Sequence, residues 1–340
     1  MPQIAIFSNE QLSKTELGNQ LRALRLHSLH ESSNFAVSVL LEFKVKDRYV
    51  YIGGVNVEND ENNRLSLHAE QNAIAAARAL LGSDAIFTRV FPMGGPKEVG
   101  PGKDPRANVF IDLCGHCRQI LLPFAAENNK RHMVTINGAI SDGKSIQELL
   151  PNAFSDKGLK DEKYPHPLPM TLFNSKSKAP FSPLYFFTRD VQPNLDHNDI
   201  HSLLQTLLPK LIDPQWETSK IRTCILKINS RYVPGVLMQD AAFLPTTALH
   251  AALGFGITSM GLAKLNVQEV HLYGLPNAKL EDNELGAIRR FAQNDVPIHF
   301  YTSHGLARSY NLTVYKQEQD KAWLEKYAPM YSVLLSNSKI

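Results

Sequence analysis

Two short motifs constrain how this chain can fold: His68-Ala69-Glu70 and Cys114-Gly115-His116-Cys117. His68, Cys114 and Cys117 are side chains of the kind that bind transition metals, and Glu70 is a carboxylate two positions after the histidine. A structural zinc site usually has four protein ligands, whereas a catalytic site has three and leaves one position open for water. The sequence therefore predicts a fold that brings both motifs together around one catalytic zinc ion, with Glu70 as the acid–base group.

Each motif alone has a simpler explanation. A CxxC at the start of a helix can be redox-active, or it can be two small residues in a core. A His-x-Glu pair at a helix start is common by chance. Their co-occurrence, each after strand-like sequence and each at an expected helix start, favours the metal site, because the partial positive charge of a helix N-terminus stabilises thiolates. Cys224 lies in an apolar strand, where we expect it to pack in a core.

The composition indicates a water-soluble protein of about two domains. Of 340 residues, 43% are hydrophobic and 20% charged, and the net charge of +3 includes no long run of one sign, so no nucleic-acid partner is expected. Three cysteines, two of them in the CxxC, exclude a disulfide scaffold and favour the cytoplasm. We find no signal peptide and no apolar run long enough to span a membrane, so no membrane contact is expected.

Hydrophobic periodicity predicts the same order of elements twice, which indicates a degenerate internal duplication. The first half has an expected helix within residues 9–30, strands at 35–43 and 49–57, a helix at 67–81, a strand at 107–111, a helix at 117–128 and a strand at 133–137. The second half has a helix at 198–208, strands at 222–229 and 232–238, a helix at 247–263, and strands at 267–273 and 298–301.

Prolines, lysines and serines dominate the chain between these halves, and proline interrupts regular structure. We therefore expect a catalytic zinc-binding domain at residues 1–160, a linker at 161–183 and an inactive domain at 184–340. The fold class is α/β, with two domains that each contain a mixed β-sheet flanked by helices, the second one degenerate. The second half lacks both His-x-Glu and CxxC, so one zinc ion per chain is expected.

Four segments of this sequence resemble the cytidine deaminase family, in particular its two-domain bacterial type with one histidine and two cysteine ligands. They are Asn56-Val57-Glu58, residues 68–74, residues 114–119 and residues 149–154. The resemblance is strong between residues 33 and 160, and weak in the second half, where residues 235–245 look like the inactive domain of that family. The two expected domains would then both be cytidine-deaminase-like.

The resemblance implies zinc-dependent hydrolytic deamination of cytidine and deoxycytidine to uridine and deoxyuridine, a reaction of pyrimidine salvage. It implies these roles: zinc ligands His68, Cys114 and Cys117, proton shuttle Glu70, ribose contacts from Asn56 and Glu58, pyrimidine packing by Phe35, and a contact from the Ala69 backbone to the base carbonyl oxygen. Phe35 could instead be part of a strand core, and Asn56 and Glu58 could lie at an exposed strand end.

The resemblance also implies a homodimer with a shared active site. Residues 240–243 are the segment expected to reach the partner's site, through Ala242 and Phe243. Phe243 could instead pack in the core of its own domain.

Three features depart from the family pattern. Leu113 stands where the family usually has proline, Ser38-Val39 replaces a Gly-Ala pair, and residues 91–106 are expected to form an extra loop between the two zinc motifs. Two alternatives therefore remain, namely a deaminase of another aminated nucleoside or base, and a zinc-bound homologue that binds without catalysis. Glu70 argues against the second alternative, because a purely structural zinc site does not need it.

Overall fold

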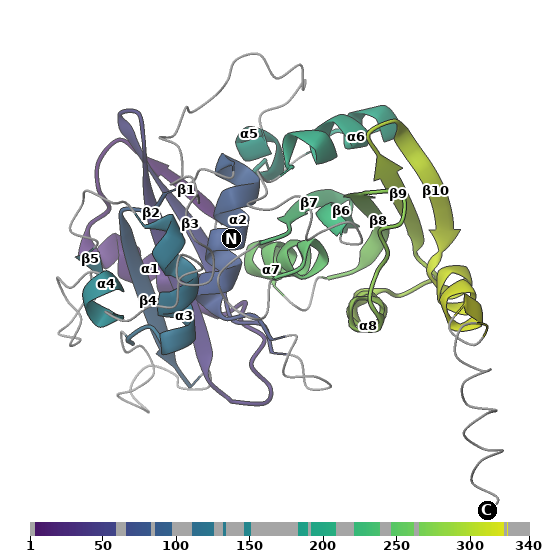
Figure 1. The fold of residues 1–340 in the computed structure, drawn as a ribbon. Helices are drawn as coiled ribbons and strands as arrows, with labels where there is room; N and C mark the ends of the chain where they lie inside the picture. Colours follow the sequence, from purple (N-terminus) through teal and green to yellow (C-terminus); the bar gives the residue numbers. More distant parts are fainter. Residues whose placement is uncertain are drawn as a thin grey trace, which may run out of the picture.

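The structure is a computed structural model that describes residues 4–58, 66–82, 86–96, 111–125, 132–133, 146–150, 183–189, 192–208, 221–238, 246–261, 265–322 and 325. These residues form two α/β units side by side, each with a five-stranded mixed sheet flanked by helices (Figure 1). The expected α/β fold class is confirmed. The expected domain boundaries adjoin residues 151–182, which lie outside the described set, so these boundaries stay a prediction.

The first sheet has the strand order β1-β3-β2-β4-β5, and only the β4–β5 pair is parallel. Its unit contains β1 (Ala5–Ser8), α1 (Lys14–Arg25), β2 (Ala36–Val45), β3 (Arg48–Val55), α2 (Ala69–Leu81), β4 (Arg89–Gly95), α3 (Gly115–Leu121), a 3-10 turn (Leu122–Phe124), β5 (His132–Met133) and α4 (Ile146–Leu149).

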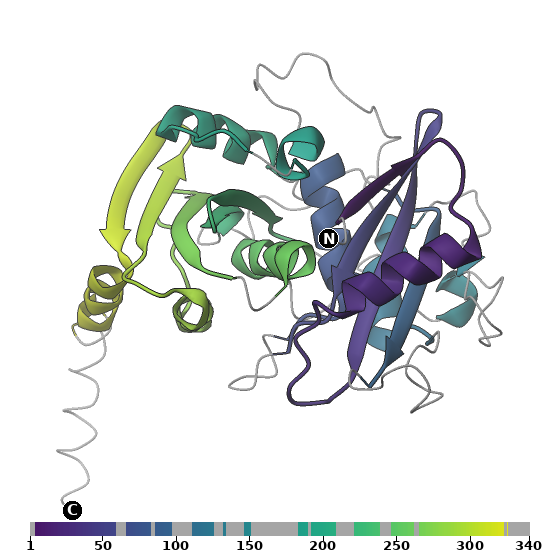
Figure 2. The ribbon, with the colours of Figure 1, turned by 180° about the vertical axis from the view of Figure 1, so that it is seen from behind.

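Both faces of this sheet are covered by helices. In β2, Val39, Leu41 and Phe43 pack with α2, whereas Leu40 packs with α1. A strand that is buried on both faces reads as a continuous apolar run rather than as an alternating one. Figure 2 shows α1 lying across one face of the sheet, and the opposite face carries α2, whose start holds the first candidate metal-binding motif.

The second sheet has the order β10-β9-β8-β6-β7, with β8 and β9 parallel. Its unit contains α5 (Pro183–Phe187), α6 (His197–Thr206), β6 (Ile221–Ile228), β7 (Arg231–Val236), α7 (Ala248–Met260), β8 (Val267–Gly274), α8 (Asp282–Phe291), β9 (Pro297–Thr302) and β10 (Gly305–Asn311). The strand sequence β7-β6-β8-β9 repeats β3-β2-β4-β5, antiparallel twice and then parallel. The topology therefore supports the expected internal duplication.

A glycine marks the same position in both units. A Cβ added at Gly54 in β3 would lie 2.3 Å from the carbonyl oxygen of Ala69 and 2.4 Å from the amide nitrogen of Ala73. A Cβ added at Gly235 in β7 would lie 2.0 Å from the carbonyl oxygen of Ala248. In each unit, the missing side chain lets the strand touch the first turn of the following helix.

A partly buried ion pair also repeats, with its charges exchanged. Glu42 in β2 pairs in register with Arg89 in β4, and Arg89 donates from Nε to a Glu42 carboxylate oxygen at 2.8 Å. Lys227 in β6 pairs in register with Glu269 in β8, and the distance from Nζ to Oε1 is 2.7 Å. The equivalence of these positions fixes the alignment of the two sheets.

The two units pack against each other through α2 and α7, which lie between the sheets in both views (Figures 1 and 2). Asn72 in α2 is fully buried there. Its Nδ2 lies 3.1 Å from the carbonyl oxygen of Val55, 3.0 Å from that of Gly254 and 2.9 Å from the hydroxyl of Thr258. Within the described residues, no helix has both the length and the apolar character needed to cross a membrane.

The expected loop at residues 91–106 is wrong in its first part, because residues 91–95 belong to β4 and are buried. Pro92 and two glycines are unusual inside a strand, so the sequence did not predict one here. Pro92 pairs with Val39 of β2, while β5 pairs only with Arg89 and Val90. In the described part of the chain, Pro92 therefore borders no second strand that would need its missing N–H. Residues 97–106, and 107–110 of the next expected strand, lie outside the described residues.

Two expected helices are shorter in the structure. α1 occupies only Lys14–Arg25 of the expected range, because Ser13 caps its start. The helix expected at residues 117–128 begins at Gly115 and ends at Leu121, followed by the 3-10 turn that contains Pro123. Proline lacks the N–H that an α-helix interior needs. Strands β1 and β10 and helix α8 were not expected from the sequence, and neither were the short helices α4 and α5.

Candidate metal centre

The two candidate metal-binding motifs lie at two helix starts. His68 is the N-cap residue of α2, and its backbone N–H donates to Oε1 of Gln71 at 2.8 Å. Cys114 is the N-cap residue of α3, and its Sγ accepts a hydrogen bond from the N–H of Cys117 at 3.4 Å. A cap residue has an extended backbone that turns its side chain toward the helix axis. The sequence therefore presents all three side chains where two helix N-termini meet.

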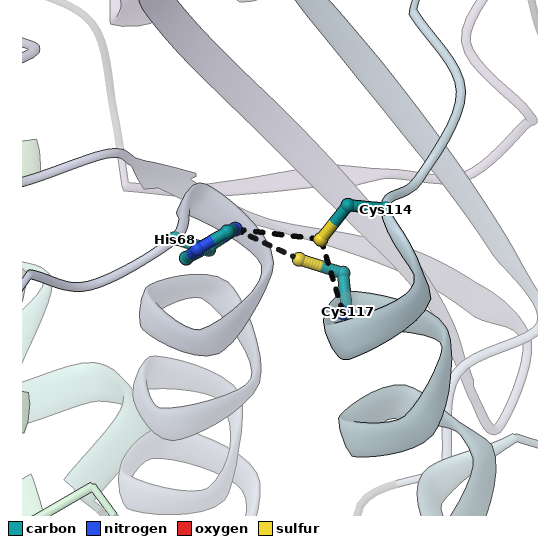
Figure 3. Close-up of side chains that lie close together, drawn as sticks. All are labelled: His68, Cys114 and Cys117. Carbon is teal, nitrogen blue, oxygen red and sulfur yellow. Dashed lines mark hydrogen bonds between the residues drawn. The ribbon is translucent and has the colours of Figure 1, made fainter. Parts of the chain in front are cut away.

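The donor atoms of His68, Cys114 and Cys117 converge (Figure 3). Nδ1 of His68 lies 3.6 Å from Sγ of Cys114 and 3.3 Å from Sγ of Cys117. Zinc bonds of about 2.3 Å to sulfur and about 2.0 Å to nitrogen place N and S about 3.5 Å apart at tetrahedral angles. One imidazole and two thiols at this spacing fit a zinc ion.

Among these side chains, the thiol of Cys114 is the most acidic. A hydrogen bond from Cys117, with a second one from His68, lowers the pKa of Cys114 to about 3. The Cys114 sulfur in turn raises the pKa of His68, and the pKa of Cys117 is raised, first through its hydrogen bond with Cys114 and then through burial. Metal binding would replace the protons that these groups share.

Glu70 lies beside this cluster as the second residue of α2, and its side chain is only 4% exposed. Burial raises the pKa of its carboxyl. Hydrogen bonds from its own backbone N–H and from the Cys117 thiol lower the pKa, but the effect of burial is larger. The structure therefore places a buried carboxyl in contact with one of the candidate ligands, as the sequence predicts for an acid–base group.

The segment with Asn56 and Glu58 is held next to His68. Val57 and Leu67 exchange two backbone hydrogen bonds, of 2.9 and 2.8 Å, in an antiparallel bridge. Glu58 is half-buried and accepts hydrogen bonds from the N–H and the hydroxyl of Ser33, the former at 2.9 Å. The Glu58 charge also contributes to the raised pKa of His68, which agrees with a position near the candidate metal ligands.

Asn56 is 8% exposed, so the alternative of an exposed strand end is wrong for this residue. Its Oδ1 accepts hydrogen bonds from the hydroxyl of Ser28 at 2.5 Å and the N–H of Val37 at 2.7 Å, and its Nδ2 donates to the carbonyl oxygen of Phe35 at 3.0 Å. The amide thus fixes the backbone around Phe35 and keeps one N–H for a ligand.

Phe35 is 39% exposed, so the strand-core alternative is wrong for its side chain. Its ring lies over Gly94 of β4, where an added Cβ would be 2.7 Å from Cε1 of Phe35 and 2.8 Å from Cδ1 of Ile111. Ile111 begins the segment that leads into Cys114. The ring therefore lies between the end of β4 and the second metal-binding motif, with a partly open face.

The remaining predicted residues fall into two groups. Ala69 is buried as the first residue of α2, so its backbone N–H belongs to the unpaired first turn of the helix. Ala242 and Phe243 lie outside the described residues, and their roles stay predictions.

The second unit has no such donor set at the equivalent helix starts. The contact of Gly235 with Ala248 matches that of Gly54 with Ala69, so Thr247 takes the place of His68, and Leu249 that of Glu70. Glu281 caps α8 as Cys114 caps α3, with Glu284 in the place of Cys117. One imidazole and two thiols have been replaced, and the carboxylate of Glu70 has been replaced by an alkyl chain. These substitutions explain why the described residues contain no second His/Cys site.

The second unit nevertheless borders the Glu58 side of the centre, which the sequence analysis missed. A small cleft there is lined by Val57 and Glu58 from the first unit, and by His250, Leu253 and Phe291 among others from the second. His250 is 8% exposed, and burial lowers its pKa to about 4. Its Nε2 has no hydrogen-bond partner among the described residues. No sequence signal could reveal this contact, because it depends on how α7 and α8 pack against the first unit.

Comparison with known proteins finds solved structures that are similar to part of this chain. No protein-family model matches the chain, and no curated protein sequence matches it. Solved structures similar to part of it include cytidine deaminase from Mycobacterium leprae, with 27% identity over 42% of this chain and 100% of that chain, at a TM-score of 0.32. The enzyme from Burkholderia pseudomallei has the same identity and coverage at a TM-score of 0.31. That from Mycobacterium tuberculosis has 23% identity over 40% of this chain and 96% of that chain, at 0.29. TM-scores this low establish no common overall fold, so the function proposed below rests on the residues of the centre itself.

Proposed function

We propose that this protein is a zinc-dependent hydrolytic deaminase that converts cytidine and deoxycytidine to uridine and deoxyuridine, releasing ammonia. The observation that carries this proposal is the convergence of one imidazole and two thiols at two helix starts, with the buried carboxyl of Glu70 beside them. Three candidate ligands leave a zinc ion with one open position, and a structural site would not need the carboxyl.

The residues divide the chemistry between them. His68, Cys114 and Cys117 would hold the ion, which when bound supplies a Lewis acid that makes water a nucleophile near neutral pH. Glu70 would take one proton from the attacking water and deliver it to the ring nitrogen of the base, and would later take the second proton from the newly added hydroxyl and deliver it to the departing amine. The C–N bond to the amino group breaks, and a C–O bond replaces it. Burial suits Glu70 for this role, because a carboxyl whose pKa is raised exchanges protons more readily near neutral pH.

Substrate binding would use the residues that border this centre. Phe35 has a partly open ring that can stack on a pyrimidine, and Glu58 has a carboxylate that can accept hydrogen bonds from ribose hydroxyls. Asn56 has one N–H left for the sugar. The Ala69 backbone N–H, at the start of α2, would donate to the carbonyl oxygen of the base. These contacts favour a free nucleoside over a free base.

We further propose a homodimer in which Ala242 and Phe243 of one chain complete the active site of the other. The support is the resemblance described above and the open side of the Phe35 ring, which one chain leaves 39% exposed. Closing the site would exclude water and strengthen its polar contacts. Phe243→Ala should weaken substrate binding without loss of zinc, and a monomer with full activity would contradict the shared site.

One assay tests the proposed reaction. Ammonia release would be measured for the purified full-length protein, with its zinc content, on cytidine, deoxycytidine, cytosine, adenosine and single-stranded DNA. We expect turnover of cytidine and deoxycytidine far above that of cytosine. The Glu58→Ala variant should reduce this difference in turnover between the nucleosides and the free base. Faster turnover of another aminated nucleoside or base would favour a different substrate, and zinc binding with no turnover would favour a non-catalytic homologue.

A further inference from the structure

The second unit carries a cluster of histidines on the face of its sheet that α6 covers. His271 in β8 pairs in register with His299 in β9, and their rings are stacked with centroids 5.0 Å apart. Glu269 lies two positions before His271 and therefore on the same face of the sheet. The ring of His197, from α6, lies with its centroid 4.9 Å from that of His299.

Three of these side chains are close enough to share one ion. Glu269, His271 and His299 each offer a donor atom, and these atoms all lie within 4.8 Å of one another. Nε2 of His271 is 3.2 Å from Oε2 of Glu269. A nitrogen and an oxygen bound tetrahedrally to the same zinc ion lie about 3.4 Å apart. The spacing therefore suits ligands as well as it suits a hydrogen bond.

The other ring nitrogen of each histidine is already held by a hydroxyl group. Nδ1 of His271 lies 3.2 Å from Oη of Tyr301, and Nδ1 of His299 lies 2.9 Å from Oγ of Ser309. Histidines that bind metals usually have their second nitrogen oriented in this way. Among the described residues Nε2 of His299 has no hydrogen bond, so it is the ligand atom that this ring can offer.

The charge states and access agree with metal binding. Burial lowers the pKa of His299 to about 4, and burial also lowers the pKa of His271, so burial favours the neutral form of both imidazoles, which is the form that binds metals. Hydrogen bonds from His271 and Lys227 lower the pKa of Glu269 to about 2. Nζ of Lys227 lies 2.7 Å from Oε1 of Glu269, so the other carboxylate oxygen, Oε2, is the one that faces His271. The Glu269 side chain is 29% exposed, which gives an ion a route from solvent.

The cluster is not a remnant of the duplicated His/Cys site. Arg89 and Glu269 occupy equivalent positions in the two sheets, so Phe91 is the counterpart of His271.

We propose that Glu269, His271 and His299 form a second metal-binding site, for a divalent transition ion of the zinc type. Two imidazoles and one carboxylate are a donor set that zinc accepts, with an open fourth position, whereas magnesium and calcium prefer oxygen alone. This proposal differs from the one zinc ion per chain that the sequence predicts, because the second site would raise the number of bound ions to two.

A cobalt titration of the metal-depleted full-length chain tests this site. We expect two Co²⁺ ions per chain to be retained through gel filtration, of which only the one at the His/Cys site gives a thiolate-to-cobalt charge-transfer band. His299→Ala and Glu269→Gln should each retain one ion with that band unchanged. His304→Ala, which removes an exposed histidine next to β9, is the matched control and should retain two.

The result that overturns the second site is a wild-type chain that retains only the ion with the thiolate band, or two ions in both cluster variants. The same residues would then form a purely structural hydrogen-bond chain from Lys227 through His271 to Tyr301. Glu269→Gln keeps the size of a partly exposed side chain, so we expect this variant to fold. It therefore tests the second site even if His299→Ala fails to fold. Because the thiolate band reports on the His/Cys site alone, failure of the proposed deaminase centre would be seen separately.

Discussion

Gly54 lets β3 touch the start of α2, and Gly54→Ala should disturb the metal centre through that contact. The added Cβ would lie 2.3 Å from the carbonyl oxygen of Ala69, whereas ordinary contact begins at 3.4 Å. The first turn of α2 must therefore move outward by about 1 Å, since the backbone of β3 is fixed between two strands. His68 directly precedes Ala69 and moves with it.

A shift of that size exceeds what a metal site tolerates, because ligand distances must hold within about 0.2 Å. We expect the zinc affinity of Gly54→Ala to fall at least about tenfold, which corresponds to about 1.4 kcal/mol. Overpacking should also lower the free energy of unfolding by about 1–3 kcal/mol. Competition with a chromophoric chelator measures the first effect, and urea unfolding of the metal-depleted protein measures the second.

Gly235→Ala is the matched control, because its Cβ would lie 2.0 Å from the carbonyl oxygen of Ala248 in the second unit. It should lower the free energy of unfolding by a similar amount and leave zinc affinity at the His/Cys site unchanged. Equal loss of zinc affinity in both variants, or unchanged affinity in Gly54→Ala, would refute the idea that this strand–helix contact positions His68.

Three further variants test other parts of the structure. Asn72→Asp replaces the buried N–H groups that bridge the two units with oxygens facing carbonyl groups, and should cost about 2–3 kcal/mol in urea unfolding; a loss below about 1 kcal/mol would contradict the bridge. Gly94→Ala should displace the Phe35 ring and raise KM for cytidine several-fold, about 1 kcal/mol, with zinc content unchanged; an unchanged KM would remove Phe35 from the substrate site. Burial lowers the pKa of His250 to about 4. Between pH 6.5 and 4 the imidazole is therefore protonated in the unfolded chain and neutral in the folded chain, so the free energy of unfolding falls as the pH drops through this range. His250→Gln should remove about 3 kcal/mol of that loss, as measured by urea unfolding at a series of pH values; an unaltered slope would refute it.

Local patterns were enough to predict several features of the fold. The hairpin of β2 and β3, the alanine-rich helix α2 and the repeated order of elements follow from periodicity, which depends on neighbouring residues only. The convergence of His68, Cys114 and Cys117 could also be predicted, since each stands at a recognisable helix start and their chemistry is useful only when combined.

Features that depend on strand pairing could not be predicted in the same way. β4 looked like a loop because Pro92 and its glycines are unusual in a strand; among the described residues, β5 pairs only with Arg89 and Val90 and so leaves Pro92 without a partner on that side. The contact between His271 and His299 depends on the register of two strands separated by α8. Asn56 illustrates a third limit, because its hydrogen bonds to the backbone near Phe35 could not be read from its position in a motif.

Glu70→Gln tests the central claim most directly, because it removes the proton-carrying group and keeps the size of the side chain. Ammonia release from cytidine and zinc content would be measured in parallel for the wild type, Glu70→Gln and Cys114→Ser. We expect Glu70→Gln to keep its zinc and lose about 10²–10⁴-fold in kcat, whereas Cys114→Ser should lose zinc and activity together. Zinc-loaded Glu70→Gln that deaminates cytidine at the wild-type rate would contradict the proposed mechanism.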